Sequence, residues 1–182
     1  EIKHIHDRIG ITVVYVTHDQ SEALTMSNRI AVFNDGVVQQ LSTPDVLYEK
    51  PENSFVAQFI GENNTLTGII KDIDGMNCTV DLDNNQGVVK ALKVNVNSVG
   101  DKTRLSIRPE RVSIDNSQSN ENIFEGKIEE LIYLGDHIRA RLDVCGNNEF
   151  IVKVPNEGNF NHKQGDVLKL SWNSTDVRAL DI

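Results

Sequence analysis

The residues best placed for chemistry follow an apolar run near the start of the chain. Residues 11–16 read Ile-Thr-Val-Val-Tyr-Val, which predicts a strand buried on both faces, as in a parallel sheet. Thr17, His18, Asp19 and Gln20 come next and lead into a helical pattern. The carboxyl end of such a strand is where α/β sheets hold ligands, and an imidazole there can donate a hydrogen bond to a phosphate oxygen or hold a water. His18 is therefore the first candidate, although on spacing alone a histidine beside a helix start is more often a local cap or a surface residue.

The other histidines offer no convergent pattern. His4 and His6 are two residues apart, so they do not share a helix face, and His137 and His162 lie far away in the sequence. We therefore expect no metal site and solvent-exposed imidazoles.

Two charged clusters in the second half also deserve a test. Glu129 and Glu130 are adjacent in a predicted strand, so they should point to opposite faces and cannot form a catalytic pair. Arg108 and Arg111 flank Pro109-Glu110 and could bind an anion, but a surface ion pair with Glu110 is the better expectation.

Composition excludes several classes of protein. The net charge of −9, from 18 basic and 27 acidic groups, has the wrong sign for a nucleic-acid-binding surface. No apolar run approaches the roughly 18 residues of a spanning helix, so we expect no direct membrane insertion. Cys78 and Cys145 match no disulfide or zinc spacing and are interpreted as reduced thiols of a cytosolic protein. The start at Glu1, without Met or a secretory signal, predicts a piece of a longer chain.

The elements that must position His18 mix helix and strand. Asp19 or Ser21 caps a predicted helix over residues 19–27, and Asp35-Gly36 predicts a hairpin turn. Further helical patterns are at Ile2, Ile5 and Ile9, after Thr43-Pro44-Asp45, and over residues 54–60 between Asn53 and Gly61.

From residue 65 onward the pattern is one of short strands separated by Asn- and Gly-rich turns, which predicts a small barrel. Residues 115–122 contain no apolar side chain and predict an exposed connector between two halves. Residues 66–70 and 124–128 begin these halves alike, which suggests a weak internal repeat. The aromatic side chains are expected in the core, namely Phe124, Tyr133, Phe150, Phe160 and Trp172.

Longer motifs carry a resemblance. They read VVYVTHDQSEAL (residues 13–24), RIAVFNDGVVQQ (29–40), FVAQFIG (55–61), LSIRPE (105–110), YLG (133–135) and GDVLKLSW (165–172). The chain resembles the C-terminal part of an ABC importer ATP-binding subunit of the maltose, polyamine, sulfate and iron type. The resemblance implies an α/β tail of a nucleotide-binding domain over residues 1–61 and an all-β, OB-like TOBE domain over residues 62–182, with the connector near 115–122.

The resemblance also implies a role for His18. In this family it would be the switch histidine, which contacts the γ-phosphate of ATP, and Thr17 and Asp19 would support it. ATP and Mg²⁺ would belong to the parent protein only. The chain has no G-x-x-x-x-G-K-[ST] loop, and the family's signature segment and catalytic glutamate would lie before Glu1, so we predict that this fragment alone is inactive.

The implied parent is a transport ATPase of the cytoplasm, peripheral on the inner face of the membrane. Its expected partners are a second ATPase subunit in a homodimer or pair, the membrane-spanning transporter subunits, and a solute-binding protein indirectly. A polyamine-type importer is slightly favoured by residues 59–64, Phe-Ile-Gly-Glu-Asn-Asn.

A stand-alone OB-like module that senses a small oxyanion remains the alternative. Residues 64–70 resemble the N-x-L-x-G-x-[IV] core of molybdate-binding modules. However, residues 60–63, which include Glu62, stand where those modules have a Ser-Ala-Arg run, and an acid there argues against oxyanion capture.

Overall fold

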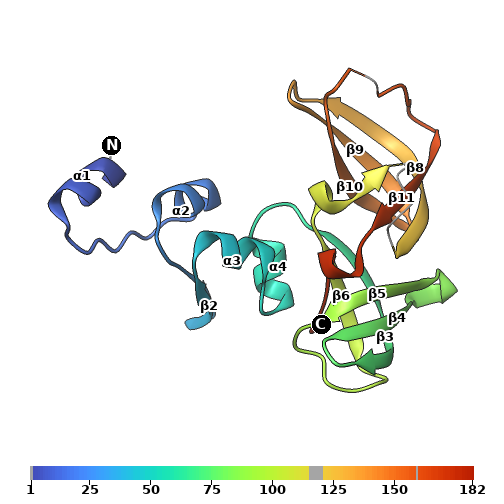
Figure 1. Ribbon diagram of the computed structural model, residues 1–182, viewed down its shortest axis with the longest axis horizontal. Coiled ribbons are helices and arrows are strands. Elements are labelled where there is room, and N and C mark those ends of the chain that lie inside the picture. The colour runs from blue at the N-terminus through green and yellow to red at the C-terminus, as the bar shows by residue number, and fades with distance from the viewer. Residues whose placement is uncertain (1, 115–120, 159) are drawn as a thin grey trace. The chain divides into compact units, whose positions relative to one another are not determined.

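The computed structural model describes residues 2–114, 121–158 and 160–182. It divides into two compact units, Glu1–Gly61 and Glu62–Ile182 (Figure 1). In the described part of the chain, no helix is long and apolar enough to cross a membrane.

Residues 2–61 of the first unit form four short helices and one hairpin. The predicted helices and the predicted hairpin are confirmed. Their bounds are α1 Ile2–Ile9, α2 Gln20–Met26, β1 Ile30–Asn34, β2 Val37–Ser42, α3 Pro44–Glu49 and α4 Ser54–Phe59.

Local turn and cap chemistry explains these boundaries. Asp35 and Gly36 have φ of 49° and 77° and form the two-residue turn between β1 and β2. The side chain of Asn53 accepts a hydrogen bond from the Val56 N–H at 2.9 Å and so caps α4. Gly61, at φ 70°, follows the end of this helix, as the sequence predicts.

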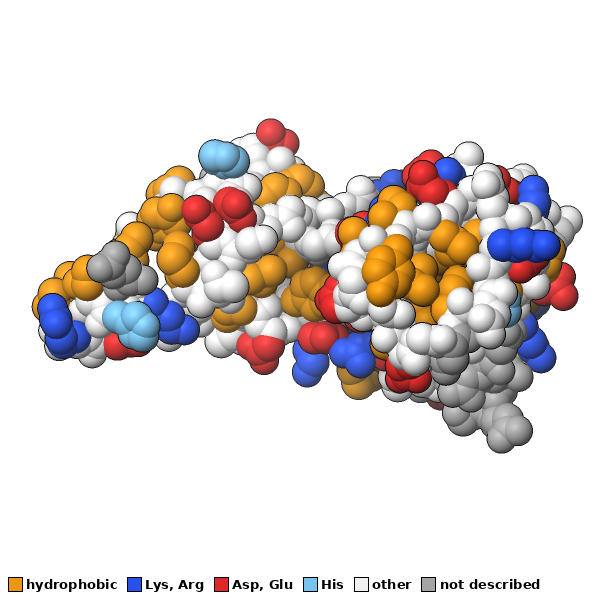
Figure 2. Space-filling view, turned by 90° about the horizontal axis from the view of Figure 1, so that it is seen from above, with side chains coloured by type: hydrophobic (Ala, Val, Ile, Leu, Met, Phe, Trp, Pro, Cys, Tyr) orange, Lys and Arg blue, Asp and Glu red, His pale blue; other side chains and the backbone are white. Residues whose placement is uncertain are grey.

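The predicted buried strand over residues 11–16 is wrong. These residues form no strand, and Val14 and Val16 are 88% and 90% exposed. A run of β-branched residues becomes a strand only where another strand pairs with it. The first unit offers one sheet among its described residues, and β1 and β2 pair with each other. Hydrophobic side chains therefore remain open to solvent on this unit (Figure 2).

The core of the first unit is small and lies between the hairpin and the helices. The side chain of Gln40 is only 2% exposed and makes two hydrogen bonds at this core. It donates to the Lys50 carbonyl and accepts from the Glu52 N–H. The buried members of the core are Ile30, Val32, Leu47, Val56 and Ile60, against which Ala23, Leu24, Tyr48 and Phe55 pack.

The described residues of the second unit form strands and three single-turn helices. The bounds are β3 Asn64–Asp74, β4 Asn77–Leu82, η1 Asp83–Asn85, β5 Val88–Lys93, β6 Lys102–Ile107, η2 Pro109–Arg111, β7 Ser113–Ile114, β8 Asn122–Tyr133, β9 His137–Val144, β10 Asn147–Pro155, β11 Val167–Trp172, η3 Ser174–Asp176 and β12 Val177–Leu180.

The strands form a closed barrel and an open sheet that exchange their last strands. The barrel has the order β12-β5-β4-β3-β6, and the second sheet has the order β10-β9-β8-β11-β7. The prediction of a small barrel is thus confirmed. β12 follows β11 in the chain but completes the barrel between β5 and β6, whereas β7 follows β6 and pairs with β11.

The internal repeat suggested by the sequence is present in the structure. Strands β3 and β8 each shift register just after an isoleucine, Ile70 and Ile128. Each of these isoleucines exchanges two backbone hydrogen bonds with a Gly-Asp pair, Ile70 with Gly100-Asp101 and Ile128 with Gly165-Asp166. The two halves are therefore copies of one strand arrangement.

Both halves contribute to one core. Buried side chains of β3 to β6 and of β8 to β12 form a single apolar cluster. Trp172, fully buried, stacks on Phe124 with ring centroids 5.1 Å apart and lies 5.8 Å from Phe150. The predicted core position of Tyr133 is wrong: the side chain is 68% exposed because it stands at the end of β8.

The connector prediction also needs correction at one end. Residues 115–120 lie outside the described residues. Glu121 is exposed, but Asn122 is the first residue of β8 and is only 2% exposed.

Candidate functional site

The candidate site lies where the extended segment of residues 11–17 turns into α2. Asp19 caps this helix: its Oδ1 accepts hydrogen bonds from the N–H groups of Ser21 at 2.7 Å and Glu22 at 3.2 Å. An acidic N-cap satisfies free backbone donors and complements the positive end of the helix. The side chain of Asp19 is therefore occupied in holding α2, beside the imidazole of His18.

Thr17 and Tyr15 are fixed by the same glutamate. The hydroxyl groups of Thr17 and Tyr15 donate to one carboxylate oxygen of Glu22, at 2.7 and 3.0 Å. The Thr17 hydroxyl in turn accepts from the Asp19 N–H at 2.9 Å. The hydrogen bond to Glu22, with the negative charge of that carboxylate, raises the pKa of Tyr15. Both neighbours of His18 are thus anchored to the first turn of α2.

His18 itself is exposed and has no hydrogen-bond or ionic partner within the described structure. An anchored backbone that presents a free imidazole suits contact with a ligand from outside this unit, because neither nitrogen is committed to an internal bond. The structure therefore places Thr17, His18 and Asp19 together, with His18 as the available group.

A mostly apolar groove with a volume of about 750 Å³ adjoins this segment. It runs between residues 12–20, α2 and β1, with Phe59 and Ile60 also in its wall. Such a lining suits apolar side chains of a packed protein surface better than the charged phosphates of a nucleotide. The groove and the free imidazole are thus suited to different contacts.

The remaining predicted candidates do not form a site. His6 and His137 each contact a neighbouring aspartate, Asp7 at 3.0 Å and Asp136 at 2.9 Å. His162 meets the ring of Phe160 edge-on. Among residues 2–114, 121–158 and 160–182, no group of His, Cys, Asp or Glu side chains is arranged to hold a metal ion.

The two glutamates of β8 contact different bases. Glu129 pairs with Lys127 at 3.3 Å, and Glu130 pairs with Arg141 at 3.4 Å. Each carboxylate is thus engaged separately.

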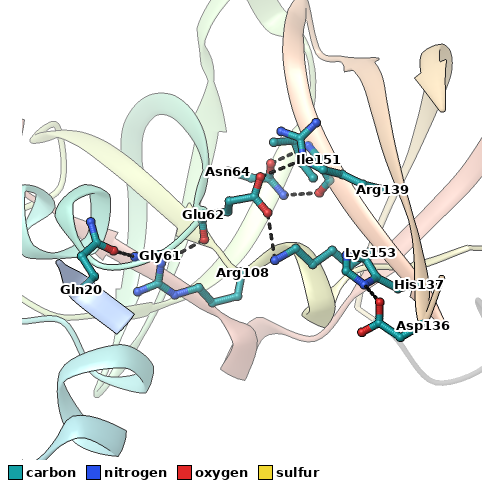
Figure 3. Close-up of polar contacts among 10 residues, drawn as sticks. All are labelled: Gln20, Gly61, Glu62, Asn64, Arg108, Asp136, His137, Arg139, Ile151 and Lys153. Atoms are coloured by element: carbon teal, nitrogen blue, oxygen red, sulfur yellow. Dashed lines mark hydrogen bonds and ion pairs between the residues drawn. The ribbon is translucent and has the colours of Figure 1, made fainter. Parts of the chain in front are cut away.

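Sequence reasoning missed a charged cluster at the start of the second unit. The carboxylate of Glu62 accepts from Arg139 Nε and from Lys153 Nζ, both at 2.8 Å (Figure 3). Arg108 donates to the Glu62 carbonyl at 3.1 Å and is only 6% exposed, so the prediction of a surface position for Arg108 is wrong. Burial opposes the ionisation of Glu62, but the hydrogen bonds from Lys153 and Arg139 outweigh it and lower the pKa of Glu62. Glu62 thus pairs with Arg139 and Lys153, the basic groups that an anion bound at this place would need as partners.

Comparisons with known proteins match the second unit to a family model and most of the chain to curated relatives. Residues 105–180 match the family model of the TOBE domain. The chain is 38% identical over 178 residues to "Spermidine/putrescine import ATP-binding protein PotA" of Pseudomonas aeruginosa. This match covers 94% of this chain and 49% of that protein. The proteins of the same name from Rubrobacter xylanophilus and Roseobacter denitrificans are 36% and 39% identical, covering 91% and 86% of this chain and 41% and 43% of theirs. The chain spans about half the length of these curated relatives.

A solved structure shares the fold. The cytoplasmic molybdate-binding protein ModG, in a crystal form with molybdate bound, superposes with a TM-score of 0.55 at 15% identity, over 65% of this chain and 96% of ModG. At this identity the likeness concerns the fold alone, and it supports the OB-like class predicted from the sequence.

Proposed function

We propose, from the premise that this chain belongs to the family of ABC importer ATP-binding subunits with a TOBE domain, that it is the C-terminal part of a transport ATPase for polyamines. The observation that carries the proposal is the similarity over 94% of the chain to a spermidine/putrescine import ATP-binding protein. This similarity includes the segment that presents His18.

The first unit is proposed to be the end of the nucleotide-binding domain. In this interpretation, residues 11–16 form a strand when the rest of an α/β domain pairs with them, which accounts for the exposed Val14 and Val16. The apolar groove beside them then packs against that domain. Residues 62–182 are proposed to be the TOBE domain that regulates the subunit and contributes to dimer contact.

His18 is proposed to act as the switch histidine. ATP with Mg²⁺, when bound to the parent protein, supplies the phosphoryl group that is transferred to water. The free imidazole of His18 fits one contact of such a site, because it is exposed and its flanking residues are anchored through Glu22 and Asp19. Its role is to donate a hydrogen bond and orient, which is where proteins contribute most to phosphoryl transfer. Thr17 and Asp19 act by holding the segment.

The chain alone does not fit the rest of a nucleotide site. Its 182 residues contain no phosphate-cradling G-x-x-x-x-G-K-[ST] loop, so nothing in them surrounds the β- and γ-phosphates. We expect no phosphate release from the isolated chain. In the parent protein, the partners are proposed to be a second ATPase subunit and the membrane-spanning subunits, with a solute-binding protein acting indirectly on the far side of the membrane. This places the subunit in the cytoplasm, peripheral to the inner membrane face.

A direct test reads the coding sequence upstream of Glu1 and then assays the complete protein. We expect a phosphate-binding loop and an acidic strand to be encoded there, and ATP hydrolysis by the purified product. His18→Ala should lower turnover by about 100-fold or more, as removal of one well-placed transition-state donor does. His4→Ala, at another exposed histidine of the first unit, is the matched control and should retain the wild-type rate. An upstream sequence without the loop, or full turnover by His18→Ala, would overturn the corresponding part of the proposal.

The oxyanion-sensing alternative is separated by titration of molybdate and sulfate into the isolated chain. We expect no heat of binding, because Glu62 already pairs with Arg139 and Lys153. Tight binding would favour the sensor instead.

A further inference from the structure

One hydrogen bond joins the His18 segment to the end of the first unit. Gln20 is the first residue of α2, two residues after His18, and its Oε1 accepts from the Gly61 N–H at 2.7 Å (Figure 3). Gly61 is the last residue of that unit, and the chain continues from it into Glu62. The bond spans 41 residues of sequence and stays entirely within the first unit.

Both ends of this bond are held in place. At one end, the cap of Asp19 and the bond from Thr17 to Glu22 fix the first turn of α2. At the other end, Gly61 has a φ of 70°, and a Cβ added there would lie 2.8 Å from the ring of Tyr48. A side chain is therefore excluded at Gly61 by both backbone conformation and space. A shift of the first turn of α2 therefore acts on Gly61 as long as Gln20 keeps its rotamer and this hydrogen bond.

We propose that Gln20 is a positioning residue that transmits displacement of the His18 segment to Gly61, the point at which the chain leaves the first unit. The inference rests on the proposed function, in which His18 responds to a phosphate. Thr17 and Asp19 tie His18 to the first turn of α2, and Gln20 ties that turn to Gly61. A displacement of His18 is thereby transmitted through the side chain of Gln20 to Gly61, the residue before Glu62.

A competing route runs through the apolar core. Ala23 and Leu24 of α2 pack against the cluster that contains the buried Ile60, next to Gly61. Coupling through this packing would not need the Gln20 amide. The two routes make different predictions for a double substitution, so they can be told apart.

The test measures amide hydrogen exchange at Gly61 by NMR in the ¹⁵N-labelled 182-residue chain. Gln20→Leu removes the acceptor and should speed exchange of the Gly61 amide about fivefold, as expected for loss of one exposed hydrogen bond. Gln20→Glu keeps an acceptor oxygen at the same position and is the matched control, with exchange expected within about twofold of wild type.

The coupling between the first turn of α2 and Gly61 is measured by removing the N-cap side chain of Asp19. Asp19→Ala should speed exchange at Gly61 several-fold when Gln20 is present and should have no further effect in the Gln20→Leu background. Asp101→Ala provides the second control, because Asp101 likewise accepts from two backbone N–H groups but lies in the second unit. It should leave Gly61 exchange unchanged.

Two outcomes would overturn the inference. An equal effect of Asp19→Ala in both backgrounds would assign the coupling to the apolar core, and no effect in the wild-type background would show that no coupling exists. The measurement involves no nucleotide. Loss of the inference therefore leaves the proposed ATPase role standing, and failure of that role would be seen separately, in the turnover of the His18→Ala protein.

Discussion

Asn64 and Asn122 occupy equivalent positions at the starts of β3 and β8. The side-chain amide of each makes two hydrogen bonds to the backbone of a strand in the opposite half, and we call each pair of bonds a clasp. Asn64 donates to the Ile151 carbonyl and accepts from the Ile151 N–H, both at 2.7 Å (Figure 3). Asn122 makes the same two bonds with Lys90, at 3.0 and 2.8 Å. The two asparagines are 1% and 2% exposed. They join the halves reciprocally, in addition to the exchanged strands β7 and β12.

Removal of either clasp should destabilise the second unit. Asn64→Ala or Asn122→Ala removes two hydrogen bonds to the backbone of Ile151 or Lys90, and we expect a loss of about 1 to 3 kcal/mol in the free energy of unfolding. Urea denaturation followed by Trp172 fluorescence measures it, because Trp172 lies in the shared core. Asn148→Ala, at an exposed asparagine of β10, should cost less than about 0.5 kcal/mol. Equal stability of all three variants would show that the clasps contribute nothing.

The two repeated glycines should differ in their tolerance of a side chain. A Cβ at Gly68 would lie 2.3 Å from the Asp81 carbonyl oxygen, whereas a Cβ at Gly126 would first meet the Leu170 side chain at 2.8 Å. Backbone in a paired strand cannot move aside cheaply, but a leucine can change rotamer. We expect Gly68→Ala to lower the melting temperature by clearly more than Gly126→Ala, which should cost about 1 to 3 kcal/mol. Calorimetry of the two variants gives the order, and the reverse order would contradict this account.

Sequence reasoning succeeded where the signal is local. The Asp35-Gly36 turn, the Asn53 cap and the Gly61 stop each depend on residues within a few positions, and all three are in the structure. The repeat of residues 66–70 and 124–128 was also predictable, because the two segments have glycine and isoleucine at the same places.

The errors have a different physical origin. Residues 11–16 have the composition of a strand, but a strand forms only with a pairing partner, and composition does not supply one. The burial of Arg108 and Asn122 depends on contacts with residues 46 and 32 positions away, Glu62 and Lys90. For the candidate site, the position of His18 beside a capped helix was predictable, whereas the bond from Gln20 to Gly61 was not.

The ion pairs of Glu62 should make stability depend on acid pH. The pKa of Glu62 in the folded chain lies below its ordinary value of 4.5, so its contribution is complete above about pH 4.5 and is lost as the pH falls through the lowered pKa. Glu62→Gln should cost about 1 kcal/mol at neutral pH, since the carboxylate is partly exposed and solvent weakens the pairs. The difference from wild type should shrink as the pH falls below 4.5. Urea denaturation across this range tests it, with Glu125→Gln, at an exposed residue of β8, as the control. A difference that is independent of pH would contradict the assignment.

The exposed apolar segment of the first unit should make the isolated chain self-associate. Val14 and Val16 are 88% and 90% exposed beside an apolar groove, and burial of each valine in a dimer interface would contribute about 1.5 kcal/mol or more. We expect a dimeric mass by light scattering that falls toward the monomer on dilution. The double substitution Val14→Asp and Val16→Asp should shift the chain to the monomer, because burying carboxylates in an apolar contact is costly. Val167→Asp, at a 60% exposed valine of β11, should leave the dimer intact. Dissociation by Val167→Asp alone would place the contact on the second unit, and a monomeric wild-type chain would contradict association altogether.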